Sequence, residues 1–171
     1  LPVAKPHTIA VRPDGKLAYV ASQEPGHFGL VVVDLATRAV VRRIDLDKPP
    51  RDPEFSHDGR FLYVTIAGVN ALRVIDAATD KPVGEIATGA SPHIGKWFAG
   101  APVGTVVVQG PGELQLFDPA AQAPLRTVAV GKQPHWMASD GKTVWVTNEG
   151  SNDVSVVDLA TGKTTTVAVG N

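Results

Sequence analysis

Residues 144–163 read Val-Trp-Val-Thr-Asn-Glu-Gly-Ser-Asn-Asp-Val-Ser-Val-Val-Asp-Leu-Ala-Thr-Gly-Lys, two β-branched runs separated by a polar loop and followed by a turn. The same arrangement occurs three more times along the 171 residues. An aspartate ends the second run of every copy, at spacings of 42, 42 and 40 residues: Asp34, Asp76, Asp118 and Asp158. A fixed period of this length is typical of propellers, solenoids and repeat arrays, in which one repeat cannot bury its own apolar face.

The last copy shows how one repeat is expected to fold. Short β-rich runs at 136–138 and 144–147 flank Asp140-Gly141-Lys142, and glycine supplies the positive φ that a tight hairpin turn needs. Two further runs follow at 153–157 and 164–169, and their β-branched residues favour strands. No segment keeps the apolar spacing of a helix over ten residues. Each repeat is therefore predicted to be a four-stranded antiparallel meander, which gives sixteen strands and almost no helix.

The repeats divide one all-β unit, residues 1–171, into four predicted propeller blades. Their approximate bounds are 4–47, 48–89, 90–131 and 132–171. The Asp-Gly turn signal recurs at Gly15 and Gly59, whereas the third repeat has Gly100 in a different setting. The aspartate that ends each third strand is expected to accept hydrogen bonds from backbone N–H groups of the following turn.

Composition and motifs exclude several classes of function. Sixteen basic residues balance seventeen acidic ones without forming a stripe, so a nucleic-acid partner is not expected. No apolar stretch is long enough to span a bilayer. The absence of cysteine excludes disulfides, thiolate ligands and thiol nucleophiles. No phosphate loop, Gly-x-Ser-x-Gly or His-Glu-x-x-His motif occurs, so an enzyme is not predicted from this chain alone.

Two stretches resemble a known repeat. Residues 6–20 read Pro-His-Thr-Ile-Ala-Val-Arg-Pro-Asp-Gly-Lys-Leu-Ala-Tyr-Val, and residues 145–148 read Trp-Val-Thr-Asn before Val-Ser-Val-Val-Asp-Leu-Ala-Thr-Gly-Lys at 154–163. They are similar to the Tyr-Val-Thr-Asn (YVTN) family of β-propeller repeats, and the resemblance covers essentially the whole chain. It implies surface-layer or periplasmic binding proteins, related in fold to haem- and copper-binding propellers. A periplasmic or extracellular location is therefore expected, and Leu1 in place of methionine fits a processed product.

Four blades leave the closure of the ring open. An open half-ring would expose the apolar faces of its first and last blades, which favours association. Two arrangements are expected ahead of a closed four-bladed ring. In one, the chain is half of a seven- or eight-bladed ring, and in the other, two chains form one ring. The predicted partners are thus missing blades or a second copy, together with a protein partner or a small ligand.

One position shared by all four repeats holds the candidate site. Each of its residues follows a proline just before the innermost strand, near the expected mouth of the channel: His7, Arg51, His93 and His135. Trp136 follows the last of them and could border the same pocket. Two interpretations stay open, namely imidazoles that bond backbone between blades, and a site for metal, haem or an anionic ligand. Arg51 repels a metal cation and suits a carboxylate or phosphate better.

The sequence therefore predicts a non-enzymatic binding scaffold of an exported bacterial protein, with a ligand or partner at the channel face. The alternative is half of a metal- or haem-dependent periplasmic redox protein that uses the histidines of the channel mouth. The scaffold requires no cofactor, whereas the alternative needs a metal or haem. The three tryptophans, Trp97, Trp136 and Trp145, are expected to pack between blades.

Overall fold

A computed structural model describes residues 3–170 of the chain. Leu1 and Pro2, which bear on the expected processing, and Asn171, at the end of the fourth predicted blade, lie outside the described residues. Sixteen strands form four separate four-stranded antiparallel sheets, and in every sheet the strands lie in sequence order. The described part of the chain contains no helix, and hence none suited to crossing a membrane. The predicted all-β fold of four meanders is confirmed.

The strands of each sheet follow one another through short turns. The first two sheets consist of β1 (Pro6–Val11), β2 (Leu17–Ser22), β3 (Gly29–Asp34) and β4 (Val40–Asp45), then β5 (Pro50–Phe55), β6 (Phe61–Ile66), β7 (Ala71–Asp76) and β8 (Lys81–Ala87). The last two sheets consist of β9 (Pro92–Lys96), β10 (Gly104–Val108), β11 (Glu113–Asp118) and β12 (Ala123–Ala129), then β13 (Pro134–Ser139), β14 (Thr143–Asn148), β15 (Asp153–Asp158) and β16 (Thr164–Ala168).

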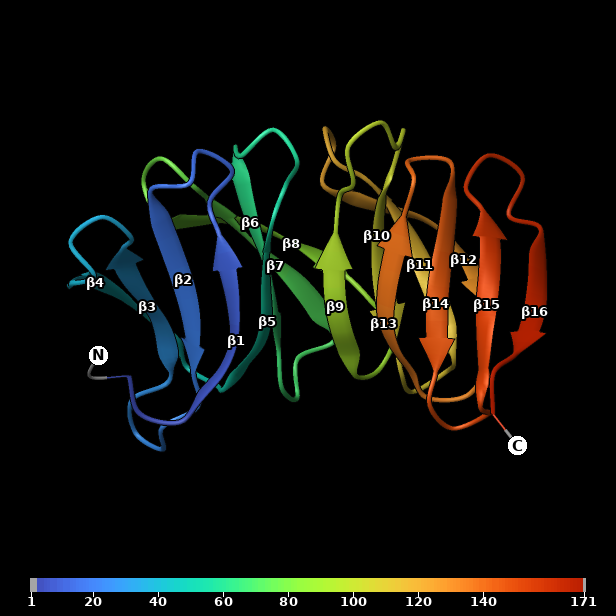
Figure 1. The fold of residues 1–171 in the computed structure, drawn as a ribbon, viewed down its shortest axis with the longest axis horizontal. Coiled ribbons are helices and arrows are strands. Elements are labelled where there is room, and N and C mark those ends of the chain that lie inside the picture. The colour runs from blue at the N-terminus through green and yellow to red at the C-terminus, as the bar shows by residue number, and fades with distance from the viewer. Residues whose placement is uncertain (1–2, 171) are drawn as a thin grey trace.

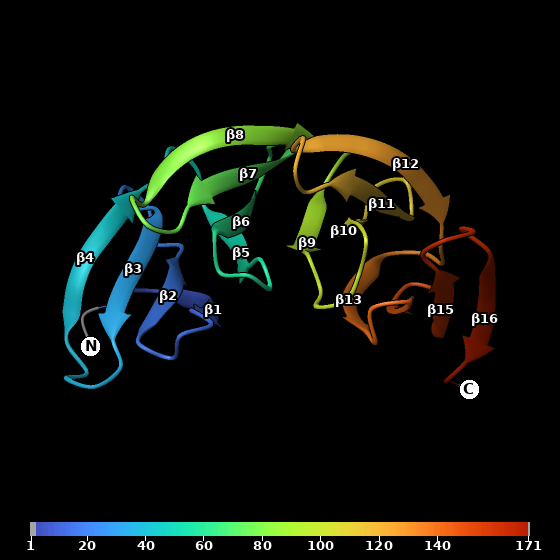
Figure 2. The same ribbon diagram turned by 90° about the horizontal axis from the view of Figure 1, so that it is seen from above.

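The sheets stand side by side along an open arc. Figure 1 shows them in sequence order along the longest axis of the molecule. Seen from above in Figure 2, the innermost strands β1, β5, β9 and β13 line the concave side, and β4, β8, β12 and β16 form the convex side. The first and last sheets occupy the two ends of the arc. This is the arrangement of consecutive propeller blades.

The apolar core lies between the sheets, with one cluster of buried side chains at each of the three junctions. Tyr19 of the first sheet meets Phe55 of the second edge to face, with ring centroids 5.1 Å apart. Tyr63, at the same strand position in the second sheet, meets Phe117 of the third at 5.2 Å. Because successive side chains point to opposite faces of a strand, each middle sheet can pack against both of its neighbours.

The predicted turn chemistry is confirmed. Asp76 accepts hydrogen bonds from the backbone N–H of Thr79 at 2.8 Å and from its hydroxyl at 2.9 Å. These bonds hold the pKa of the Asp76 carboxyl below its ordinary value. The aspartates that end the other third strands accept backbone N–H groups in the same way. The turn between the first two strands of every sheet contains a glycine at positive φ: Gly15, Gly59, Gly100 and Gly141.

The tryptophans correct one expectation. Trp97 is partly buried and packs against the core clusters on both sides of the third sheet. Trp136 and Trp145 are instead exposed. Their neighbours Met137 and Val146 face the third sheet, so the two indoles lie on the opposite face, where the arc ends. The prediction that all three tryptophans pack between blades is therefore wrong for Trp136 and Trp145.

Replacing Phe117 with leucine should lower the free energy of unfolding by about 1 to 3 kcal/mol, because the ring is fully buried and loses its edge contact with Tyr63. Urea unfolding measures this change. Leu125→Ala on the exposed side of β12 is the control and should change it by less than about 0.5 kcal/mol. Equal losses for the two variants would contradict a core located between the sheets.

Candidate functional site

A β-bulge marks the candidate position in every sheet. The register between the innermost strand and its neighbour shifts at this position in all four sheets. The bulged stretches contain His7, Arg51, His93 and His135. A bulge leaves a residue unpaired and changes the direction of its side chain. The four residues are therefore set at the start of the innermost strands, at the lower end of the molecule in Figure 1.

The chain enters each bulge through a constrained segment. Lys5, Ser91 and Gln133, which stand two residues before the bulged histidines, have φ values of 45°, 58° and 48°. Residues other than glycine rarely adopt this left-handed conformation, so the entry stores some backbone strain. A hydrogen bond holds it in place, because the N–H of Gln109 donates to the carbonyl of Ser91 at 3.0 Å, and the other sheets repeat this bond.

His7 joins the first two sheets. Its Nδ1 donates to the backbone carbonyl of Arg51 at 2.9 Å, and the hydroxyl of Thr8 donates to the same carbonyl at 2.6 Å. This is the bond between blades that the structural interpretation of the histidines expects. For His7, the geometry thus accounts for the imidazole without a ligand.

His93 and His135 contact each other across the junction of the third and fourth sheets. Their ring centroids are 4.2 Å apart and the planes meet at 87°. The Nδ1 atom of His93 is buried and has no hydrogen-bond partner. Burial, followed by the nearby charges of His135, Arg51 and His7, lowers the pKa of His93 to about 4. His93 is therefore neutral at pH 7 and has one ring nitrogen whose hydrogen-bonding capacity is unused.

Two polar side chains that sequence reasoning did not single out complete the mouth. Arg51 donates to the amide oxygen of Gln109 at 3.4 Å, and His135 Nδ1 donates to the carboxylate of Glu149 at 3.0 Å. Gln109 and Glu149 both directly follow the second strand of their sheets. The shared repeat position was the signal that could have identified them.

Two hollows adjoin this group at the lower end of the third and fourth sheets. One, of about 500 Å³, is lined by Ser91, Gln109, Gln133 and Glu149 together with the backbone of Gly110. The other, of about 470 Å³, also includes Gln109 and Gln133 and extends toward the fourth sheet.

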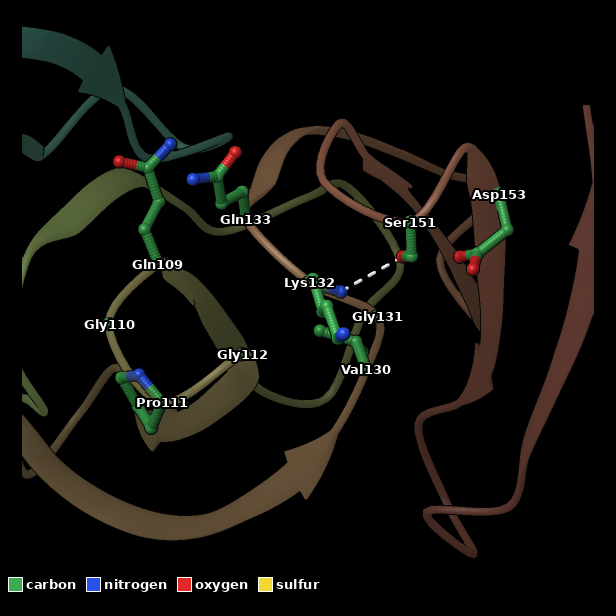
Figure 3. A pocket seen from close by; sticks show the side chains of 10 residues that line it. All are labelled: Gln109, Gly110, Pro111, Gly112, Val130, Gly131, Lys132, Gln133, Ser151 and Asp153. Atoms are coloured by element: carbon green, nitrogen blue, oxygen red, sulfur yellow. Dashed lines mark hydrogen bonds between the residues drawn. The ribbon is translucent and has the colours of Figure 1, made fainter. Parts of the chain in front are cut away.

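Figure 3 shows the larger-lined of these hollows, the one that extends toward the fourth sheet. The hydroxyl of Ser151 there accepts from the backbone N–H of Lys132 at 2.9 Å. Glycine is required at 131, because a Cβ atom would lie 2.5 Å from the Ser151 oxygen. Both hollows thus combine backbone with uncharged and charged polar side chains.

Asp52 is a buried carboxyl beside the site that the sequence analysis missed. Burial and the neighbouring carboxylate of Glu54 raise the pKa of Asp52 to about 7, although a hydrogen bond from Thr8 and the charge of Lys96 act in the opposite direction. One of its oxygens has no partner. No repeat pattern marks this residue, because the equivalent positions hold threonine, isoleucine and tryptophan.

The structure brings the four bulged residues to one end of the arc, but Trp136 does not join them. Its side chain lies on the exposed face of the last sheet, as described above. Across residues 3–170 there is no group of three or more His, Cys, Asp or Glu side chains placed to hold a metal ion.

Changing Asp52 to asparagine should remove a penalty that grows with pH. Because the folded-state pKa is raised, the folded protein binds more protons than the unfolded chain between about pH 4 and 7, so the Asp52 contribution to stability falls as pH rises through this window. The stability of Asp52→Asn relative to wild type should therefore increase from pH 4 to 8, by at most a few kcal/mol at about 1.4 kcal/mol per pKa unit. Urea unfolding at both pH values tests this, with exposed Asp45→Asn as the control. A difference that is independent of pH would contradict it.

Neither a protein-family profile nor a curated protein sequence matches the chain. Three solved structures are similar. Hydrazine synthase from Kuenenia stuttgartiensis has a TM-score of 0.82 at 24% identity, covering 98% of this chain and 51% of that one. The dihydro-heme d1 dehydrogenase NirN, in complex with DHE, has a TM-score of 0.77 at 19% identity, covering 97% and 38%. U3-55K has a TM-score of 0.79 at 9% identity, covering 96% and 52%.

The chain spans at most about half the length of these similar proteins. At such identities the likeness shows the fold alone, because one fold supports many unrelated functions. The more specific YVTN resemblance stays a prediction. The four sheets of this chain are blades of a β-propeller.

Proposed function

We propose that this chain is a non-enzymatic β-propeller scaffold that binds an anionic group, a carboxylate or phosphate, at the mouth of its channel. The observation that carries the proposal is the group of Arg51, His93 and His135 at one end of the innermost strands. Within it, the buried Nδ1 of His93 has no partner. A buried polar atom without a partner is unusual, and a ligand is one means of satisfying it.

The chemistry of the group favours an anion. Arg51 keeps its positive charge at all physiological pH values and can donate two parallel hydrogen bonds to a carboxylate or phosphate. Its partner in the free protein is the neutral amide of Gln109, so binding need not break an ion pair. His93 is neutral at pH 7 and can donate one further hydrogen bond. Arg51 is thus the anchor, and His93 supplies direction.

A location outside the cytoplasm of a bacterium belongs to the same proposal. Its support is the resemblance of residues 6–20 and 145–163 to YVTN repeats, together with the absence of cysteine. Protein partners or small ligands are both compatible with an anion site at this position, because either can present a carboxylate.

The residues fit the alternative, a metal- or haem-dependent redox protein, less well. His93 and His135 would supply two imidazoles, which is fewer than a zinc or copper site uses. The charge of Arg51 near His93 also opposes a bound cation. Metal analysis of the purified protein separates the two functions, because a stoichiometric metal would favour the alternative.

Arg51→Gln should weaken the binding of citrate or inorganic phosphate by about tenfold or more, because a hydrogen bond to a charged group contributes about 1.5 to 3 kcal/mol. Isothermal titration calorimetry at pH 7 and low ionic strength measures the affinity. Arg38→Gln, in the turn at the opposite end of the first sheet, removes the same charge and should leave the affinity unchanged. Absence of binding by the wild type, or equal losses in both variants, would exclude the anion site.

His93→Gln separates a binding role from a structural one. If His93 donates to the ligand, the variant should fold with near-normal stability and lose affinity for both anions. A purely structural role predicts the reverse, a modest loss of stability with unchanged affinity. Glu149→Gln should strengthen binding a few-fold, because it removes a carboxylate that repels the ligand, and added salt should reduce this gain.

A further inference from the structure

The last sheet exposes a position that the preceding sheets bury against their successors. Tyr19 and Tyr63 occupy the strand position that Trp145 occupies in the last sheet. Both tyrosines are 0% exposed, and each packs against an aromatic ring of the next sheet. Trp145 is 38% exposed and Trp136, on the same face, 47%. This face, here called the trailing face, thus carries the features of a buried junction without its cover.

The first sheet exposes the other half of such a junction. Phe55 covers Tyr19 from the second sheet, and Val11 holds the equivalent position in the first sheet, as the pairing with the second strand shows. Val11 is 52% exposed, and Ile9, two residues earlier on the same face, is 62% exposed. We call this the leading face. No sheet of the chain lies in front of it, as Figure 2 shows.

A hydroxyl on the trailing face repeats a contact made between sheets. In the second sheet, Thr65 accepts from a backbone N–H of its own inner strand at 3.2 Å and donates to the carbonyl of His93 in the next sheet at 2.6 Å. Thr147 holds the same position in the last sheet and accepts from its own inner strand, the N–H of Trp136, at 3.1 Å. The carbonyl of His7 in a following first sheet would complete the pattern.

The shapes of the two faces are also complementary. In the second sheet, Leu72 packs so closely on Gly95 of the next sheet that a Cβ atom there would lie 2.4 Å from it. The last sheet has the smaller Val154 at the position of Leu72, beside a hollow of about 360 Å³. The first sheet has the larger Ile9 at the position of Gly95. A large-to-small contact becomes a small-to-large one, which conserves the packed volume.

We propose that the trailing face of one chain packs on the leading face of a second copy, so that two chains close one eight-bladed ring. The matching surface identified here belongs to this chain itself, which is why a second copy is the partner. Two copies related by a twofold axis form two identical joints and leave no free face. Eight blades lie within the range that propellers adopt. Each joint would also place His135 of one copy near His7 of the other, so the channel mouth is incomplete in a single chain.

Sedimentation velocity of the full chain over a range of concentrations tests the proposal. A species of two chains is expected. Trp145→Glu and Ile9→Glu, each alone, should weaken the dimer at least about thirtyfold, because each places a charge in the centre of a joint. Leu125→Glu on the convex side is the matched control and should leave the dimer unchanged. Thr147→Val, which keeps the volume and loses the hydroxyl, should weaken it by about tenfold.

An equal mixture of Trp145→Glu and Ile9→Glu chains distinguishes this joint from other dimers. A mixed pair contains one unaltered joint, so mixing should restore part of the dimer that neither variant forms alone. Pairing of two trailing faces predicts no effect of Ile9→Glu and no rescue. A monomer at about 100 µM, an open polymer, or unchanged association of folded Trp145→Glu would overturn the proposal. Circular dichroism verifies that each variant is folded, and the milder Thr147→Val decides the matter if the charged variants are not.

Discussion

Each sheet of this protein needs a neighbour, because a short antiparallel sheet with two apolar faces can bury neither of them within its own repeat. The contacts of Tyr19 with Phe55 and of Tyr63 with Phe117 are two instances of one junction. Stability therefore accumulates junction by junction along the arc. The same requirement explains the position of the bulged residues, because packing successive sheets face to face brings the starts of their innermost strands to one end.

Most of the fold could be predicted from the sequence because the deciding interactions are local. The aspartates and glycines of the turns act within a few residues, and β-branched alternation defines the strands between them. Even the third repeat, which lacks the Asp-Gly pair, places Gly100 at positive φ in its turn. The exposure of Trp136 and Trp145 could not be read in the same way. An indole at a junction position is buried only if another sheet follows, and that depends on the assembly.

The candidate site was predictable in location and much less so in its contacts. A proline before each bulge aligned the four residues, and the structure sets them at one end. Which of them touch depends on the tilt between sheets, so the contact of His93 with His135 and the bond of His7 to the next sheet were not readable from spacing. Asp52 gave no signal, because a lone carboxylate in a strand looks solvated until a neighbouring sheet covers it.

The bonds between sheets at the channel mouth end on main-chain oxygens. The carbonyl of Arg51 accepts from His7 and Thr8, and that of His93 accepts from Thr65. Every amino acid offers this carbonyl, so the residue at the bulge can change without removing the bond that joins the blades. Histidine in three repeats and arginine in one are a direct expression of this freedom. The framework and its chemistry can therefore evolve separately, with a new mouth acquired one side chain at a time on an unchanged ring.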